Sequence, residues 1–523
     1  MSPSLRDPDS HGDAAARSAC AEGQSVGGAS AASALGSTQS YCFTPRTGDA
    51  LGDSAERRRD RWGARAMLWQ ASSLKAVRCC GRMLHNDGVR DPDDGQMVGI
   101  RRREVAGGAV ASYQGLMTCG SVWSCPRCAV VIAHTRADEI GAAVRECHRQ
   151  GGKVYLLTLT MRHTKKDRLD ELWDALSAGW RSAFGTRKWT GQRETTVERR
   201  GKLAVIPARV GDSELFDIAG ITRVVEATYG APDRGGHGWH LHVHALVFSA
   251  SGLASALRSD LSNWCDYSFD RDWLGRNAFA SRVHDRWSAG VQRAGYLAPG
   301  SVAVDVREVA QDGADYVGRY LAKATYSAAS SMGMEIGAGQ LSKAARTQRN
   351  RTPFEILSEL AASVDSRGFG VRTPRQWAVK EALDGDWAVI DTETGEVVAV
   401  TPPGEWAVWH EWERASKGRR QIVWSRRRST PSATREQLWN SLLDARGTSA
   451  AQTDEEVASA ETDGELLGEI SRADWYRIVV WRPELVANVL EAAEIDGGYA
   501  VECLLRRAGV EMKRPPPRQR PAA

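Results

Sequence analysis

Residues 221–248 read ITRVVEATYGAPDRGGHGWHLHVHALVF, and they decide the fold that we expect for this chain. Two runs rich in β-branched and apolar residues, 221–229 and 239–248, flank a turn that contains glycine and proline. This pattern predicts two antiparallel strands joined by a loop. In the second run, His240, His242 and His244 alternate with apolar residues, so the three imidazoles are expected on one face of the sheet.

A carboxylate is expected beside these histidines. If the two strands pair symmetrically about Arg234, Glu226 lies opposite His242 and within contact range. A shift of one residue would send Glu226 to the other face, and its alternative role is to neutralise a basic neighbour. In the symmetric register, Glu226, His240, His242 and His244 suit Mn²⁺ or Mg²⁺ acting as a Lewis acid, with Zn²⁺ as an alternative.

Residues 312–326 have the spacing of a helix that carries two tyrosines. One face holds side chains suited to phosphoryl chemistry: Tyr316, Arg319, Tyr320 and Lys323. Another face holds a small apolar stripe that would pack on a sheet: Ala314, Val317, Leu321 and Ala324. A tyrosine oxygen can attack a phosphodiester, and nearby cations favour the phenolate and bind the phosphate. A packed aromatic pair is the alternative interpretation of the tyrosine spacing.

The chain has ten cysteines, and some of them have metal-ligand spacing. Cys119, Cys125 and Cys128 include a CxxC pair typical of structural zinc sites. We take Cys80 as the fourth ligand. Three other side chains are alternatives to it: Cys79, His85 and His134. A set of reduced thiols in a hydrophobic core is the competing interpretation, and a redox role is disfavoured because no βαβ pattern surrounds the CxxC pair.

The composition favours a globular, cytoplasmic protein of several domains. The apolar fraction of 42% and the charged fraction of 26% exclude a disordered chain. No apolar run is long enough to span a membrane, and residues 1–26 lack the apolar core of a secretory signal. No P-loop motif occurs, so a nucleotide-driven motor is not expected in this chain.

The expected architecture is α+β, with a central antiparallel sheet and flanking helices. A zinc-binding segment precedes this domain, and a mixed α/β DNA-binding region follows it. We divide the chain into five parts: a disordered region at 1–60, a cysteine-rich segment at 61–150, a catalytic domain at 151–330, a basic region at 331–450, and an acidic linker with a small helical piece and a Pro/Arg tail at 451–523.

Two stretches of the chain, 187–202 and 414–428, concentrate basic residues, although the net charge of +4 alone indicates little about partners. Arginine with interleaved tryptophan suits phosphate contact and base stacking. A solvated basic face is the alternative interpretation. With one arginine of the tyrosine helix, the residues that we expect to bind DNA are Arg187, Lys188, Arg199, Arg200, Arg319, Arg419 and Arg420.

Three motifs in chain order resemble the rolling-circle replication initiators of bacterial plasmids, members of the HUH endonuclease superfamily. They are LLTLTMRH at 156–163, EATYG with GWHLHVHALVF within 226–248, and YVGRYLAK at 316–323. The resemblance covers about residues 75–330. In addition, CGSVWSCPRC at 119–128 is similar to the cysteine-rich stretch of these initiators, and RTPFEIL at 351–357 and GRRQIVWS at 418–425 are similar to actinobacterial members.

The resemblance implies an HUH nickase domain with a metal-binding pair, His242 and His244, beside His240. It implies that Tyr320 attacks the scissile phosphate at the plasmid origin, joins the 5′ phosphate and leaves a 3′-OH that primes synthesis. Some relatives carry a glutamate four residues before the tyrosine. This chain has Tyr316 there, so Tyr316 is a candidate second nucleophile.

The implied partners are single-stranded and duplex origin DNA, a host helicase and host replication proteins. Three alternative functions fit the same sequence features: a transposase or relaxase of the same superfamily, a non-enzymatic zinc-dependent DNA-binding regulator, and a metallohydrolase acting on a small phosphoester.

Overall fold

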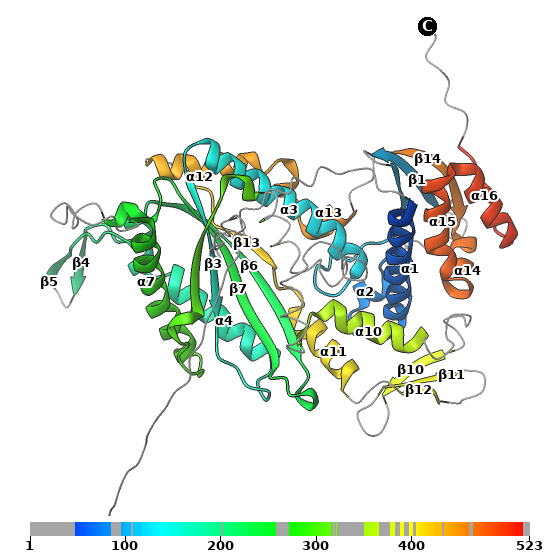
Figure 1. The fold of residues 1–523 in the computed structure, drawn as a ribbon, viewed down its shortest axis with the longest axis horizontal. Helices are drawn as coiled ribbons and strands as arrows, with labels where there is room; N and C mark the ends of the chain where they lie inside the picture. The colour runs from blue at the N-terminus through cyan, green and yellow to red at the C-terminus, as the bar shows by residue number, and fades with distance from the viewer. Residues whose placement is uncertain are drawn as a thin grey trace, which may run out of the picture. The chain divides into compact units, whose positions relative to one another are not determined.

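The described residues all belong to one compact unit, Ser40–Ala523. The structure is a computed structural model. It describes residues 48–84, 96–105, 108–199, 202–257, 271–314, 317, 321, 350–365, 377–381, 387–391, 397–400, 404–430, 433–459 and 464–515 (Figure 1).

A central antiparallel sheet with flanking helices confirms the expected α+β class. Its strand order is β13-β6-β7-β3-β8, and β9 pairs with the end of β6. The strands are β3 (Lys153–Thr160), β6 (Ile218–Gly230), β7 (Gly238–Ser249), β8 (Val304–Val309), β9 (Asn350–Arg351) and β13 (Ile422–Trp424). The two strands predicted at 221–229 and 239–248 are present as β6 and β7. Thus residues from 350 onward add two strands to the sheet that carries the histidines.

The pairing of β6 with β7 has the symmetric register about Arg234. Glu226 is the partner of His242, and Val224 is the partner of His244. The register follows from alternation: a slip of one residue in β7 would turn the histidines into the apolar core that Leu241 and Val243 fill. The register assumed from the sequence is therefore confirmed.

Helices cover both faces of this sheet (Figure 1). On one face, α4 (Leu169–Phe184) and α7 (Arg271–Arg293) pack their apolar residues, such as Leu172 and Phe279, against β3 and β7. On the other face, α3 (Pro126–Arg149) and α12 (Thr434–Ala445) pack against Leu246 and Phe248. The apolar residues of α4 recur at helical spacing, which gives this helix one apolar face for the sheet.

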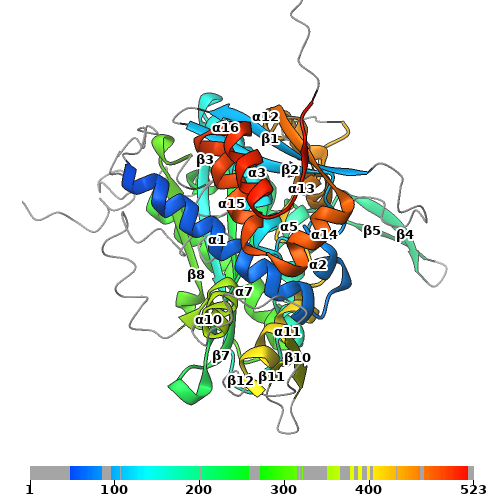
Figure 2. The same cartoon turned by 90° about the vertical axis from the view of Figure 1, so that its right-hand side faces the viewer.

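A second sheet joins segments that are far apart in the sequence. Its order is β15-β14-β1-β2, with strands β1 (Met97–Val105), β2 (Gly108–Gln114), β14 (Glu465–Ser471) and β15 (Met512–Lys513). Figure 2 shows α15 (Glu484–Ile495) and α16 (Gly497–Arg507) over this region, beside α1 (Gly48–Ala71). With α14 (Arg472–Trp481), these elements enclose a hydrophobic core of their own.

Two expectations about this region were wrong. The range 465–469, expected in an acidic linker, belongs to β14, because its backbone pairs with the distant β1. The range 48–60, expected to be disordered, begins α1. Arg58 and Arg59 there form ion pairs with Glu494 and Glu491 of α15, contacts that the local sequence does not reveal.

Several smaller elements complete the described part of the chain. A three-stranded sheet consists of β10 (Trp377–Glu381), β11 (Trp387–Asp391) and β12 (Val397–Val400). The remaining helices are α2 (Lys75–Cys79), α5 (Arg187–Thr190), α6 (Asp212–Leu215), α10 (Pro353–Asp365), α11 (Glu405–Ser416) and α13 (Asp454–Ser459). The short 3₁₀ turns are Pro232–Arg234, Leu253–Leu257, Ser301–Ala303, Gln311–Gly313 and Thr448–Ala451.

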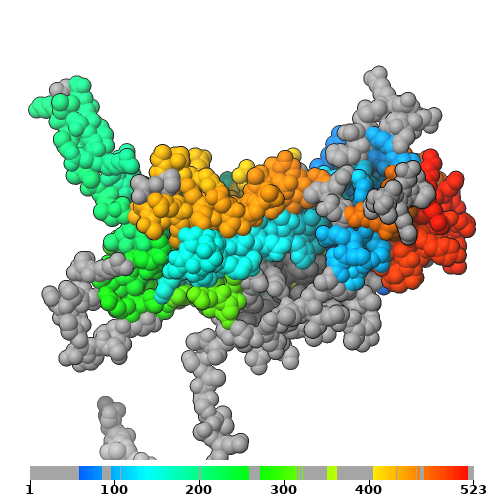
Figure 3. All heavy atoms as spheres, turned by 90° about the horizontal axis from the view of Figure 1, so that it is seen from above, coloured from blue at the N-terminus to red at the C-terminus, as the bar shows by residue number. Residues whose placement is uncertain are grey.

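The hairpin of β4 (Thr195–Arg199) and β5 (Lys202–Ile206) projects outward from the helices beside it (Figures 1 and 3). Leu203 and Val205 in this hairpin are 77% and 61% exposed, so this pair of strands contributes little to the core. Among the helices that the structure describes, none combines the length and apolarity needed to span a lipid bilayer.

Candidate metal centres and the surrounding site

Three ligand-type side chains converge on the face of β6 and β7 that carries the histidines. Oε2 of Glu226 lies 2.8 Å from Nε2 of His242 and 3.0 Å from Nε2 of His244. Ligands that share one ion at about 2.1 Å, at right angles, lie about 3 Å apart. Glu226, His242 and His244 therefore fit a divalent ion and leave coordination positions open.

Neighbouring groups orient Glu226, His242 and His244, which we call the trio. Nδ1 of His244 lies 3.1 Å from Oγ1 of Thr158 on β3, and such a partner orients the imidazole. Nδ1 of His242 is buried and has no hydrogen-bond partner among the described residues. Although burial alone would raise it, the pKa of Glu226 is held well below its usual range by hydrogen bonds from the two histidines. Glu226 is thus a carboxylate at neutral pH, as a metal ligand must be.

His240 lies next to this trio but makes a different contact. Its Nδ1 lies 2.9 Å from Nε2 of His163, which follows the end of β3. Burial, together with the charge of His242, lowers the pKa of His240 to about 4. Neither His163 nor Thr158 was among the site residues predicted from the sequence. Both lie within the LLTLTMRH motif, which was the available signal.

The polar face of the tyrosine helix lies outside the described residues: Tyr316, Arg319, Tyr320 and Lys323. Its apolar stripe is described at Ala314, Val317 and Leu321, which are helical and buried. They share a hydrophobic cluster with Leu246 and Phe248 of β7. Because alternate residues of a strand share a face, this stripe packs on the face of the sheet that carries His242 and His244.

Four thiols form a second cluster, the four-cysteine cluster: Cys80, Cys119, Cys125 and Cys128. The Sγ of Cys80 lies 3.6 Å from those of Cys125 and Cys128, and the Sγ atoms of Cys119 and Cys128 are 3.7 Å apart. Four sulfurs around one zinc at about 2.3 Å would be about 3.8 Å apart. The cluster could therefore hold a zinc ion.

The thiols of the four-cysteine cluster differ in pKa, and two buried arginines lie beside them. Hydrogen bonds among the thiols lower the pKa of Cys80 well below its ordinary value and raise that of Cys119 well above it. Although burial works against charge on Arg65 and Arg127, the thiols raise the pKa of both guanidinium groups. Two fixed positive charges offset the net negative charge of a zinc ion bound by four thiolates. Of the alternatives to Cys80, His85 lies outside the described residues.

The residues expected to bind DNA lie in two places. Arg187 and Lys188 are exposed on α5, near the β4–β5 hairpin. Arg419 pairs with Asp174, with 3.0 Å between Nη2 and Oδ1, whereas Arg420 is exposed in the loop between α11 and β13. The backbone of Arg199 ends β4, while Arg200 and Arg319 lie outside the described residues.

Two curated proteins are similar to this chain. A Streptomyces lividans protein named "Protein rep" is 29% identical over 330 residues, which are 60% of this chain and 63% of that protein. A "Neomycin resistance protein" of Streptomyces cyanogenus is 35% identical over 184 residues, 32% of this chain and 38% of that protein. No protein-family model and no solved structure matches the chain.

The matches therefore span less than two thirds of each relative. The first relative's name supports the resemblance to Rep-type proteins drawn from the motifs.

Proposed function

We propose that the chain is a plasmid replication initiator that nicks one DNA strand at the origin and remains joined to it through Tyr320. The observation that carries this proposal is the Glu226–His242–His244 trio on the sheet face where the stripe of the tyrosine helix is buried. The similarity to a protein named Rep supports the same role.

In the proposed reaction, the phenolate of Tyr320 attacks the scissile phosphorus. A bond forms between its oxygen and phosphorus, the bond to the 3′ oxygen breaks, and that oxygen takes up a proton to become the priming 3′-OH. Arg319 and Lys323, on the same helical face in the sequence, would favour the phenolate and bind the phosphate. In a second step, the phenolate of Tyr316 would attack the regenerated origin phosphate and release its 3′ oxygen. That 3′-OH would then attack the phosphorus joined to Tyr320, which closes the displaced strand and frees the Tyr320 oxygen.

Glu226, His242 and His244 would hold a divalent ion, Mn²⁺ or Mg²⁺, which would draw charge from the phosphate. His240 would lie beside this site and contact His163, as it does in the structure. The four-cysteine cluster would hold a structural zinc ion. The proposed partners are origin DNA, single-stranded and duplex, with a host helicase and replication proteins.

A covalent adduct tests this proposal. A pool of single-stranded DNA labelled at its 3′ end is incubated with protein and Mn²⁺, and labelled protein is resolved on a denaturing gel. Peptide mass is expected to locate the label on Tyr320. The adduct should disappear with EDTA, in His242→Ala and in Tyr320→Phe. The matched control Tyr499→Phe alters an exposed tyrosine of α16 and should form the adduct.

The rival functions give different results in the same assay. A non-enzymatic zinc-dependent regulator would bind DNA without an adduct, and loss of Tyr320 would not affect it. A metallohydrolase of small phosphoesters would turn over without a covalent intermediate. A transposase or relaxase would form the same adduct, and only the DNA sequence that it cleaves would separate it from an initiator.

A further inference from the structure

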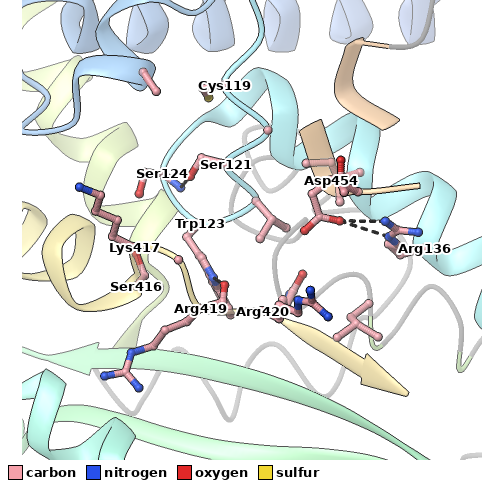
Figure 4. A pocket seen from close by; sticks show the side chains of 18 of the residues that line it. Cys119, Ser121, Trp123, Ser124, Arg136, Ser416, Lys417, Arg419, Arg420 and Asp454 are labelled. Carbon is pink, nitrogen blue, oxygen red and sulfur yellow. Dashed lines mark hydrogen bonds and ion pairs between the residues drawn. The ribbon is translucent and has the colours of Figure 1, made fainter. Parts of the chain in front are cut away.

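A pocket of about 880 Å³ lies apart from the Glu226–His242–His244 trio (Figure 4). Three walls form it. The first is α2 with the residues before it, the second is the loop 119–124, and the third is the segment 416–424 between α11 and β13. Residues 450–454 and two arginines, Arg136 and Arg446, close its remaining side.

The charge of the pocket is strongly positive. Its lining includes seven cationic side chains and one carboxylate: Lys75, Arg78, Arg136, Lys417, Arg419, Arg420 and Arg446, against Asp454. Three of the arginines pair with carboxylates. Arg136 binds Asp454 and Glu139, Arg446 binds Glu139, and Arg419 binds Asp174.

Three exposed cations of the lining have no carboxylate partner among the described residues, and we call them the rim cations: Lys75, Lys417 and Arg420. Arg78 donates to the carbonyl of Ser72, at 2.6 Å, and likewise has no carboxylate partner in the described part of the chain. Free cations around one hollow are suited to an anionic ligand.

Buried polar groups indicate the same kind of ligand. Ser124, Ser416 and Gln421 line the pocket and are 0%, 1% and 4% exposed. Their Oγ, Oγ and Nε2 atoms have no hydrogen-bond partner among the described residues. A buried polar group without a partner destabilises the fold. Hydroxyl and amide donors beside ammonium and guanidinium groups match the acceptor oxygens of a phosphate.

The two tryptophans of the pocket are already packed. Trp123 lies edge-on to Trp173 and Trp412, and its Nε1 donates to the Arg419 carbonyl at 2.7 Å. Trp424 is covered by the Arg446 guanidinium, 4.0 Å from its ring centre. Neither ring is therefore free to stack on a base. The pocket can contact a phosphate backbone, and such contacts carry no base sequence information.

The four-cysteine cluster connects the walls. Cys119 and Cys125 bracket the loop 120–124, and Cys80 directly follows α2. A metal ion bound by these thiols would tie the first wall to the second. The third wall is attached to both, because Trp123 donates to the Arg419 carbonyl and Glu413 of α11 accepts from the Ser73 backbone at 2.7 Å.

We propose that this pocket binds phosphate groups of a DNA strand regardless of base sequence, and that metal in the four-cysteine cluster maintains it. DNA as the ligand rests on the proposed function. The binding test below does not depend on nicking. It uses His242→Ala as the parent protein, so that the trio does not cleave the probe.

The first experiment measures the affinity for a fluorescein-labelled single strand by anisotropy at several KCl concentrations. The triple variant Lys75→Ala/Lys417→Ala/Arg420→Ala should bind at least tenfold more weakly. Three lost phosphate contacts should reduce the slope of log K against log[salt] by about 2. The matched control Arg103→Ala/Arg507→Ala/Lys513→Ala removes three exposed cations outside the pocket and should keep the parent slope.

Three results would overturn the pocket as a DNA phosphate site. They are parental affinity and slope in the triple variant, a loss that depends strongly on the base sequence of the probe, and full competition by dGTP at an equal phosphate concentration. The last result would make a nucleotide the ligand. A failure to form the Tyr320 adduct would reject the nickase but would leave this binding comparison intact.

The second experiment tests the role of the metal. The thiol-bound metal is removed from the parent and from the triple variant with a mercurial and a chelator, the mercurial is then reversed with thiol, and metal content is measured by mass spectrometry. The metal-free parent should bind DNA about as weakly as the triple variant, while the triple variant should change less than twofold. An unchanged affinity in the metal-free parent would reject the coupling.

Discussion

Glu226 lies directly opposite His242 on the adjacent strand, with 2.8 Å between Oε2 and Nε2, and the same oxygen lies 3.0 Å from His244. One carboxylate thus bridges two imidazoles on one face of the sheet. Replacing that oxygen by an amide nitrogen tests its role directly. Glu226→Gln should weaken Mn²⁺ binding at least tenfold by isothermal titration calorimetry, because a charged ligand is lost.

The control for this variant is Glu198→Gln, which changes an exposed glutamate of β4. It should bind Mn²⁺ as the wild type does. Equal affinities in the two variants would remove Glu226 from the metal site.

Thr158 is expected to act through His244. Thr158→Val keeps the shape of the side chain and removes the partner of the imidazole Nδ1, so Mn²⁺ affinity should fall about tenfold. Thr160→Val changes the next residue on the same face of β3, for which no side-chain hydrogen bond is described, and should leave the affinity within twofold. A similar loss in both variants would indicate a general effect on the strand.

The four-cysteine cluster predicts one tightly bound zinc ion. Cys125→Ala should release it and lower the thermal midpoint, as judged by metal analysis and calorimetry. Cys147→Ala is the matched control, since Cys147 is a buried thiol outside the cluster, whose pKa burial raises to about 12. It should retain the zinc ion. Zinc retained in Cys125→Ala would contradict the assignment.

The depressed pKa of Glu146 leads us to expect that the free energy of unfolding depends on pH. Hydrogen bonds from Arg149, Gln150 and Ser441 lower its pKa from 4.5 to about 2. A carboxylate with a depressed pKa stabilises the fold above its unfolded pKa, and this contribution is lost as pH falls through the folded value. Because Arg149 is 69% exposed, we expect only about 0.5–1 kcal/mol.

Urea unfolding of wild type and Glu146→Gln should therefore differ by this amount at pH 6, and the difference should shrink between pH 5 and pH 3. Glu171→Gln is the control, because the ion pair of Glu171 with Arg168 spans 3.9 Å between exposed side chains. A difference for Glu146→Gln that persists unchanged at pH 3 would contradict the assignment.

Tyr316 separates the two proposed steps. Tyr316→Phe should form the first adduct at the wild-type rate but fail to recircularise the displaced strand, because the second phenolate is missing. A circular single-stranded product measured on a gel checks this. Recircularisation at the wild-type rate would show that Tyr316 is not a second nucleophile.

Sequence patterns within short segments were enough to predict the two histidine-bearing strands and their pairing. Alternation in 239–248 placed the three histidines on one face, and the symmetric turn placed Glu226 opposite His242. The four cysteines were also selected from their spacing. The contact between His163 and His240 was not predicted, because it joins a residue beyond the end of β3 to β7 through a side-chain hydrogen bond alone.

Pairings between distant segments could not be predicted either. The three residues of β13 continue the sheet beside β6, and they carry no strand signal long enough to identify that neighbour. Likewise, the local sequence of 465–471 does not specify β1 as its partner. Such contacts depend on the folded surfaces that neighbouring elements offer, not on the periodicity of one segment.

The pairing of β1 with β14 has a consequence for synthesis of the protein. Residues 97–105 leave the ribosome long before residues 465–471 are synthesised. One edge of β1 therefore stays without its native partner strand until most of the chain has been translated. An unpaired strand edge is a template for pairing with other chains. We therefore expect chains that stop before residue 460 to aggregate, and late synthesis of the C-terminal segment to decide the yield of native protein.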